Sequence, residues 1–431
     1  MVANRNLLLL LVDCLGSDAL LGAGKSAVTP AIDGLRERGV CFPNAIAAAT
    51  YTTPSVASLL TGLYPSAHGI RSLAGYRLPR GCHTLAAILQ QQGYDTAAFV
   101  TGPLGPETGL DRGFGLYEHR DAADVCFGPW GGAFLRSFPE RLRAPWFAFL
   151  HLWELHHPRY VAPEFEGESW GRTRYDRALS TVDAFVGRLL GKLDPTETLV
   201  VLTGDHGEKL AQGTARGLRS TVRWTINHAG PLKGLLERLI RSGRLPRGVR
   251  DFGVSMHGYH VYDVLARLPL IIAGGDGFAG GDVIEGQVRT VDVVPTVLDL
   301  LGAQVPHGPA GQGVSLREVA SGARADLSPA LIESHEATKM NTGLLVGIRT
   351  PEWKLCFAAD DGDVPWELYN LRSDPAERRN VAGRFPDVAR RLHRQALDLM
   401  AEGQRLALAP EALSADEQAI AERRLADLGY L

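Results

Sequence analysis

Short runs of mostly apolar residues recur along the chain, and they constrain its fold more than any other feature of the sequence. The clearest run is the first, in which six apolar residues follow one another. The five runs are Leu7–Val12, Thr96–Val100, Trp146–Leu150, Leu199–Leu202 and Leu268–Ala273. Because a strand covered on both faces has apolar side chains at every position, each run predicts a buried strand, and none is long enough to span a bilayer.

Helical patterns separate these runs. Ala31–Arg38 follows a capping Thr and a Pro and ends at Gly39, as many helices do. Leu85–Gln92 is a second helix that ends at a glycine, and Arg174–Leu193 is a longer one with apolar residues along one face. Strands that alternate with helices form a sheet covered on both sides. The sequence therefore predicts an α/β fold with a mostly parallel central sheet and helices on both faces.

The last quarter of the chain has a different pattern. Its apolar segments are short and are separated by turn residues: Leu344–Arg349, Trp353–Phe357 and Trp366–Leu371. This pattern predicts a small antiparallel sheet, which a polar helix rich in Arg and Glu follows from Phe385. We expect the α/β domain to occupy residues 1–325, and the small sheet and the closing helices to occupy residues 326–431.

A basic stretch interrupts the first domain. Residues 209–256 carry many Lys and Arg residues and few acidic ones, and Pro231–Arg241 within them resembles a short amphipathic helix. We interpret this stretch as a solvated surface insertion, because runs of charge usually are. The alternative is a lid or an anion-attracting rim over an active site, with peripheral contact to anionic lipid headgroups.

Charge and cysteine content exclude several classes of protein. The formal net charge is -3, which argues against nucleic acid and against a membrane surface as general partners. The five cysteines are scattered and form no C-x-x-C pair, so we expect neither a disulfide framework nor a zinc-thiolate site. The N-terminal apolar run is too short for a signal peptide. We therefore expect a soluble, cytoplasmic protein without a transmembrane segment, of open oligomeric state.

Acidic and imidazole side chains follow three of the apolar runs. Ligands of open parallel sheets bind at the carboxyl ends of the strands, so these side chains should gather at one edge. They are Asp13, then His151, Glu154, His156 and His157, then Asp205 and His206. Asp and His together suit a divalent metal such as Zn or Mn. Taken singly, each could equally be a helix cap or a structural residue.

A further hydroxyl-bearing segment reads as the start of a helix. Between Tyr51 and Gly62, a Thr stands at the cap, a Pro lies just inside, and the Gly follows the end. A helix N-terminus offers free N–H groups to an anion, and a hydroxyl beside a metal loses its proton more easily. Thr52 is therefore a candidate nucleophile. Local rules alone allow a plain cap and turn, and Ser55 and Ser58 are rival nucleophiles.

The order of these segments resembles the sulfatase family of the alkaline phosphatase superfamily. The resemblance covers nearly the whole chain except the basic stretch and the extreme C-terminus. It is carried by segments such as NLLLLLVDCLGSDAL, TPAIDGLRERGVCFPNAIAAATYTTPSVASLLTGLYPSAHGI, PWFAFLHLWELHHPRY, VVLTGDHGE and VRTVDVVPTVLDLLG. It implies an alkaline phosphatase-like α/β fold with a C-terminal small-sheet segment.

The resemblance also implies roles for individual residues. Thr52 occupies the position of the nucleophile, where it would also contact the metal. His156 and His257 match residues that contact the oxygens of the bound ester or protonate the leaving group. The remaining metal ligands by position are Asp13, Asp205 and His206. A second metal site from Glu154, His157 and His257 is an open alternative.

Two departures from the family pattern bear on the chemistry. Sulfatases proper oxidise a Cys or Ser of a C-x-P-S-R signature to formylglycine, whereas this chain has Thr52 there and Val56 at the Arg position. Cys14 replaces a second acidic residue, which favours Zn or Mn over Ca. We expect a metal-dependent hydrolase or transferase that acts on a phosphodiester or phosphomonoester through a covalent Thr52 intermediate. The alternatives are a sulfuric ester hydrolase and a catalytically inactive sulfatase-like binding protein.

Overall fold

The computed structural model describes most of the chain. The described ranges are 5–208, 260–274, 278, 280–304, 311–320, 329–335, 343–360, 364–409 and 411–428. The basic stretch 209–256 and His257 lie outside the described residues, so the predictions made for them stay predictions. Within the described ranges, no helix has the length and apolar character needed to cross a membrane.

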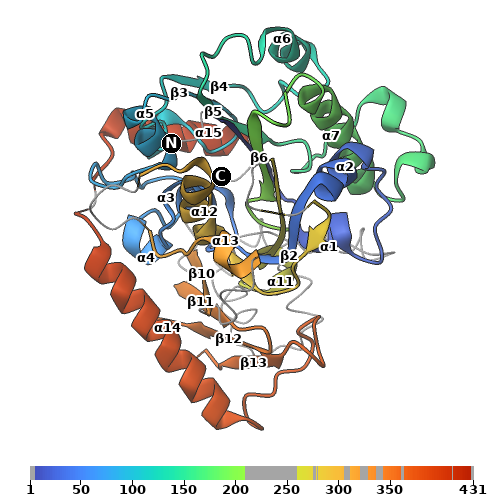
Figure 1. Cartoon of the computed structure of the whole chain (residues 1–431). Coiled ribbons are helices and arrows are strands. Elements are labelled where there is room, and N and C mark those ends of the chain that lie inside the picture. The colour runs from blue at the N-terminus through green and yellow to red at the C-terminus, as the bar shows by residue number, and fades with distance from the viewer. Residues whose placement is uncertain are drawn as a thin grey trace.

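A nine-stranded sheet forms the middle of the larger part of the molecule (Figure 1). Its strands lie in the order β4-β3-β5-β1-β6-β7-β2-β8, and β9 pairs with β2. The strands are β1 (Asn6–Val12), β2 (Gly39–Ile46), β3 (Asp95–Val100), β4 (Leu116–His119), β5 (Trp146–Leu152), β6 (Thr198–Gly204), β7 (Arg267–Ala273), β8 (Asp282–Val283) and β9 (Val288–Arg289). β7 runs antiparallel to both of its neighbours, and the other pairings are parallel. The predicted mostly parallel α/β sheet is confirmed.

All five predicted runs are strands of this sheet, but β2 escaped prediction. Its centre contains Pro43 and Asn44, two residues that are rare in strands. The pairing of β2 with β7 shifts register between Phe42 and Ala45, so the strand accommodates these residues in an irregularity. An irregular strand of this kind has no continuous apolar pattern for sequence analysis to find.

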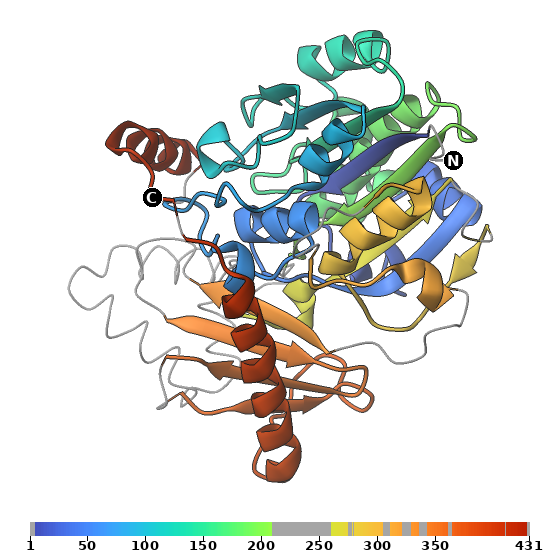
Figure 2. The same cartoon turned by 60° about the vertical axis from the view of Figure 1, so that its left-hand side comes forward.

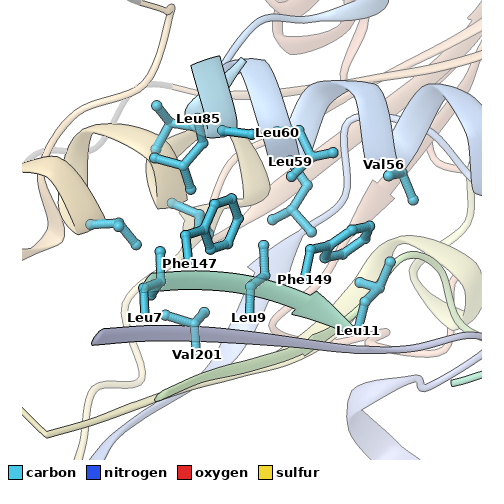
Figure 3. Close-up of a cluster of buried hydrophobic side chains, with 14 of the residues drawn as sticks. Leu7, Leu9, Leu11, Val56, Leu59, Leu60, Leu85, Phe147, Phe149 and Val201 are labelled. Carbon is cyan, nitrogen blue, oxygen red and sulfur yellow. The ribbon is translucent and has the colours of Figure 1, made fainter. Parts of the chain in front are cut away.

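Side chains of β1 alternate between two apolar cores. Leu7, Leu9 and Leu11 face the core beneath α3 (Thr52–Thr61), α5 (Leu85–Gln91) and α12 (Val293–Leu301). Figure 3 shows them beside Phe147 and Phe149 of β5, under Val56, Leu59 and Leu60 of α3. Leu8, Leu10 and Val12 face the opposite core, under α2 (Pro30–Arg38), α6 (Pro129–Ser137) and α7 (Arg174–Leu190). Helices thus cover both faces, as predicted.

The remaining short helices connect these layers. They are α1 (Ser17–Leu21), α4 (Pro65–His68), α11 (Asp263–Ala266), α13 (Leu316–Ala320), and the 3-10 turns η1 (Pro106–Thr108), η2 (Pro163–Phe165), η3 (Glu168–Trp170) and η5 (Thr290–Asp292).

A second, four-stranded antiparallel sheet follows in the chain, as predicted. Its strands lie in the order β10 (Ala330–His335), β11 (Leu344–Arg349), β12 (Trp353–Ala358) and β13 (Glu367–Asn370). The long helix α14 (Pro386–Leu406) crosses one face of this sheet, with Leu392 and Ala396 in the same core as Val346 and Phe357 (Figure 2). β10 was not predicted, because its short apolar run Ala330–Ile332 is followed by Glu333, Ser334 and His335.

The last described helix, α15 (Ala415–Asp427), returns to the larger part of the molecule (Figure 2). Leu425 of α15 packs against Tyr51 and Leu73. Glu417 accepts a hydrogen bond at 2.5 Å from Arg77. Tyr51 also donates its hydroxyl to the carbonyl of Arg71 at 2.5 Å. The end of the chain is therefore fixed beside the residue that precedes Thr52.

A buried charge network connects the two sheets. Lys354 of β12 is fully buried, and its Nζ lies 2.6 Å from Asp263 Oδ1 and 3.0 Å from Glu377 Oε1. Arg349 of β11 contacts the same Asp263 at 2.9 Å. Asp263 begins α11, which leads directly into β7 of the large sheet. Two cations of the small sheet thus neutralise a carboxylate that belongs to the larger part.

We predict that Lys354→Met destabilises the protein by about 3–5 kcal/mol, because it leaves two buried carboxylates without their shared cation. Urea unfolding measures the change. Lys192→Met is the matched control, since the Lys192 ammonium group lies 3.9 Å from Glu140 in a partly exposed pair and should change stability by less than about 0.5 kcal/mol. A loss below about 1 kcal/mol for Lys354→Met would contradict the assigned role.

Candidate active site

Two carboxylates lie side by side where β1 and β6 end. The strands pair in register up to Val12 and Gly204, so Asp13 and Asp205 leave the same edge of the sheet. Asp205 Oδ1 accepts hydrogen bonds from the backbone amides of Cys14 at 3.1 Å and His206 at 2.8 Å. The Nε2 atom of His206 lies 3.4 Å from Asp205 Oδ2. All of these side chains are buried, and the three ligands expected from the resemblance converge.

Thr52 reaches this group from the N-terminus of α3. Its Oγ1 donates a hydrogen bond to Asp13 Oδ2 at 3.2 Å and lies 3.5 Å from His206 Nε2. The expectation that a Thr caps this helix is wrong, because Tyr51 is the capping residue and Thr52 is the first helical residue. Its hydroxyl therefore projects from the helix end toward the carboxylates instead of folding back on the backbone.

Contacts along α3 fix the position of Thr52. Ser55 donates its hydroxyl to the backbone carbonyl of Asp205 at 2.5 Å, which joins the first turn of α3 directly to the segment after β6. The hydroxyl of Ser55, one of the rival nucleophiles, is thus occupied in a backbone contact. At the far end, Gly62 adopts a left-handed conformation with φ 70° and stops the helix. The other rival nucleophile, Ser58, contacts His68 Nε2 at 2.9 Å and not the carboxylates.

His156 lies close enough to Asp13 and His206 for their charges to act on it. Its ring stacks on Trp153 with centroids 4.0 Å apart, and its Nδ1 lies 2.9 Å from the carbonyl of His157. Burial lowers the pKa of His156 to about 4, although the charge of Asp13 acts in the opposite direction. The imidazole is therefore neutral near pH 7. His257, its expected partner, lies outside the described residues.

Two residues of the predicted second metal site have other surroundings. Glu154 is buried, and its Oε1 accepts a hydrogen bond from the amide of Cys126 at 2.7 Å and lies 3.5 Å from Arg120 Nη2. His157 is exposed. Neither belongs to the groups of described residues whose ligand atoms lie close enough to hold a metal. The structure does not bring Glu154 and His157 together as ligands.

His151 is one of the imidazoles expected at this edge of the sheet, but the resemblance assigned it no individual role. It lies at the end of β5, next to β1, and is fully buried. Its Nε2 lies 3.4 Å from Asp13 Oδ2. The sequence shows that His151 follows an apolar run, but only the order of strands in the sheet shows that this run lies beside β1.

Cys14 occupies a strained position between the two carboxylates. Its backbone has φ 61°, in the left-handed region that non-glycine residues seldom adopt and that is often found near functional sites. The Tyr175 hydroxyl donates to its carbonyl at 2.7 Å, and its Sγ donates to Asp13 Oδ1 at 2.9 Å. Burial raises the pKa of the Cys14 thiol well above its ordinary value, so it is a donor here. Each oxygen of Asp13 therefore has a different neighbour.

The donor set fits a divalent cation. Burial and the charge of Asp13 raise the pKa of Asp205 to about 6. Burial would also raise the pKa of Asp13, but the hydrogen bond with His151 and the charge of His206 hold it below its ordinary value. Asp205 Oδ2 is buried and accepts no hydrogen bond from the described residues. Two neighbouring buried carboxylates are costly unless a cation neutralises them, and carboxylate, imidazole and hydroxyl groups are ligands of Zn and Mn.

We predict that Asp205→Asn is at least as stable as the wild type in a chelator, because it removes the repulsion between two buried carboxylates. With zinc at about 1,000 times its Kd, the wild type should gain about 4 kcal/mol of stability, and the variant much less. Urea unfolding with and without zinc measures both effects. The exposed Asp398→Asn is the control and should match the wild type. An equal gain from zinc in Asp205→Asn would contradict the proposed ligand.

Comparisons with known proteins match both parts of the chain. The family model described as Sulfatase matches residues 5–303, and the model described as N-sulphoglucosamine sulphohydrolase, C-terminal, matches residues 257–402. Arylsulfatase K of Danio rerio is 34% identical over 134 residues, which cover 31% of this chain and 25% of that protein. Arylsulfatase A of Homo sapiens is 26% identical over 486 residues, covering 90% of this chain and 86% of that protein.

A solved structure has the same fold. The phosphonate monoester hydrolase of Agrobacterium radiobacter superposes with a TM-score of 0.67 at 20% identity. The alignment covers 95% of this chain and 97% of that one. At this identity the likeness concerns the fold, and it extends over the large sheet and the small sheet alike.

Proposed function

Because this chain belongs to the sulfatase family of the alkaline phosphatase superfamily, we propose that Thr52 is the nucleophile of a metal-dependent hydrolase or transferase of phosphate-type esters. Enzymes of the family are ester hydrolases that depend on a divalent ion. The observation that carries the proposal is the position of the Thr52 hydroxyl. It is buried at the start of α3, 3.2 Å from Asp13 Oδ2 and 3.5 Å from His206 Nε2.

The identity of residue 52 favours phosphate over sulfate. A sulfatase of the formylglycine type needs a Cys or Ser that can be oxidised to an aldehyde, and the secondary alcohol of a Thr cannot give one. A sulfo-threonine therefore lacks the easy exit that a formylglycine hemiacetal provides. The Arg position of the signature is Val56, a fully buried residue in the core beneath α3 (Figure 3). No guanidinium from that position can stabilise the aldehyde hydrate.

The named relatives divide between the two chemistries. The phosphonate monoester hydrolase supports a phosphorus-centred reaction on this fold, and the arylsulfatases keep a sulfuric ester hydrolase as the second candidate. Thr52 supports the phosphorus ester here, since phosphoryl transfer needs only a positioned hydroxyl and neutralising charge.

The residues of the site suggest how the reaction would proceed. A divalent cation held by Asp13, Asp205 and His206 would lower the pKa of the Thr52 hydroxyl and neutralise an oxygen of the ester. Thr52 Oγ1, oriented by its hydrogen bond to Asp13 Oδ2, attacks phosphorus while the bond to the leaving oxygen breaks, and the hydroxyl proton is lost to solvent. Water or a second alcohol then attacks the phospho-threonine and releases the group.

The leaving group requires a proton donor. His156 is the described candidate, and its Nδ1 is directed at the carbonyl of His157, so Nε2 is the atom that would deliver the proton. Because its pKa is low, it must acquire this proton within the complex, where an anionic ester lies nearby. We propose His257 as the second basic residue, on the basis of the resemblance alone.

The ligand chemistry also supports a metal preference. Imidazole from His206 and the thiol of Cys14 beside Asp13 are softer neighbours than the carboxylates that a calcium site requires. We therefore propose Zn or Mn as the natural ion. The five cysteines are all free and buried, which supports the proposal of a reducing, cytoplasmic location.

We predict that Thr52→Ala abolishes turnover while the fold survives, and that Thr52→Ser retains part of it, because a primary hydroxyl can still attack. Quenched reactions followed by mass spectrometry should find an adduct on Thr52, and its accurate mass distinguishes phosphoryl from sulfuryl transfer. Thr53→Ala is the matched control, since the Thr53 hydroxyl donates to the carbonyl of Leu73 at 3.1 Å and takes no part in the site. Wild-type turnover by Thr52→Ala would end the proposal.

Metal removal separates an enzyme from an inactive binding protein. Chelation should abolish hydrolysis, and Zn or Mn should restore it more fully than Ca. The assay uses nitrophenyl phosphate, phosphodiester, phosphonate and sulfate esters in parallel. The highest restored activity should be on a phosphorus ester. Highest activity on the sulfate ester would favour the second candidate, and loaded protein that hydrolyses none of the four would favour the binding protein.

A further inference from the structure

The imidazole of His151 lies beside Asp13 and has no role in the proposed reaction. His151 lies opposite Leu11 in the parallel pairing of β5 with β1. Paired residues of neighbouring strands point to the same face, and Leu11 faces α3, so the His151 side chain points to the side of the sheet from which Thr52 approaches. Its Nε2 lies 3.4 Å from Asp13 Oδ2, the same oxygen that accepts the Thr52 hydrogen bond.

The separations between donor atoms form a connected series. His151 Nε2 is 3.4 Å from Asp13 Oδ2, which is 3.2 Å from Thr52 Oγ1. His206 Nε2 is 3.5 Å from that Oγ1 and 3.4 Å from Asp205 Oδ2. Around a five-coordinate ion, ligand bonds of about 2.1 Å at angles of about 90° to 120° separate neighbouring ligand atoms by about 3.0 to 3.6 Å. All four separations are therefore those expected of atoms that share one ion.

A simple hydrogen bond explains the position of His151 less well. Hydrogen bonds between an imidazole and a carboxylate are usually about 2.7–2.9 Å long, and burial strengthens them. Here both groups are fully buried, yet their atoms stay 3.4 Å apart. On the opposite side, Asp205 Oδ2 accepts no hydrogen bond from the described residues. One ligand atom each of Asp13, His151 and Asp205 lies within 4.8 Å of the other two, so the three residues can share one space.

The backbone and the ring of His151 are held without help from Asp13. Its carbonyl accepts a hydrogen bond from Arg120 Nη2 at 3.3 Å. Its ring meets the Trp153 ring edge-on, with centroids 5.7 Å apart. The imidazole is therefore oriented by the end of β5 and by packing, as a preformed ligand requires.

We propose that His151 is a further ligand of the metal ion, through Nε2, beside Asp13, Thr52, Asp205 and His206. This inference rests on the proposed function and deepens it. The ion would have two imidazole ligands, one from β5 and one from the segment after β6, in place of the carboxylate lost at Cys14. Two imidazoles favour Zn, Mn or Co over Ca.

X-ray absorption at the zinc edge of the loaded full-length protein tests the inference, because imidazole ligands give a characteristic scattering signal that can be counted. The wild type should show two imidazoles, and His151→Gln should show one. Competition with a chromophoric chelator should give a zinc Kd for His151→Gln that is weaker by more than about 100-fold, beyond the range for residues that only orient a ligand. Gln can still donate a hydrogen bond to Asp13, so it preserves a purely orienting role.

The control is His119→Gln. His119 ends β4, which β3 and β5 separate from β1, and its ring contacts the carbonyl of Gly102 at 3.0 Å, so its substitution should leave both measurements unchanged. One imidazole in the wild type, or unaltered zinc affinity in His151→Gln, would overturn the inference while the proposed function stands. Failure of the wild type to bind zinc, manganese or cobalt would overturn both. The number of imidazole ligands in the wild type tests the inference even where His151→Gln does not fold.

Discussion

The structure depends on two carboxylates that are buried side by side. Asp13 and Asp205 leave adjacent parallel strands at the same edge, away from water, and burial together with the charge of Asp13 raises the pKa of Asp205. Such an arrangement costs free energy in an isolated chain, and apolar packing on both faces of β1 must maintain it. This buried negative charge explains the arrangement of the groups around it. Amides, imidazoles and a hydroxyl all point at these oxygens, since each of them, like the ion they imply, lowers the cost of the buried negative charge.

Helix α3 connects this constraint to reactivity. Its apolar face rests on β1 and β5 (Figure 3), and Ser55 ties its first turn to the carbonyl of Asp205. The same packing that stabilises the sheet therefore sets the position of the Thr52 hydroxyl. Val56, which stands at the Arg position of the formylglycine signature, is fully buried in the same core and contributes to this packing.

The sequence predicts those parts of the structure that depend on local pattern. Strands such as Leu7–Val12 can be predicted because both of their faces are buried. Asp13, Asp205 and His206 can be predicted as candidate site residues because they follow such strands. β2 cannot be predicted in this way, since Pro43 and Asn44 interrupt its pattern. For α3, the sequence predicts a Thr at the cap, because local rules prefer a Thr to a Tyr there. The cap is instead Tyr51, and Thr52 is the first residue of the helix. His151 needed the order of the sheet, which arises from long-range pairing that no local pattern encodes.

The packing of α15 has a consequence for how the protein matures. Leu425 contacts Tyr51, the residue directly before Thr52, and the amide of His335 donates to the Tyr51 hydroxyl at 3.1 Å. Segments synthesised more than 280 residues apart, as the numbering from 51 to 335 shows, therefore meet at one tyrosine next to the nucleophile. On the ribosome, the large sheet can assemble long before α15 emerges from the exit tunnel. A chain without α15 would lack this apolar support beside Tyr51.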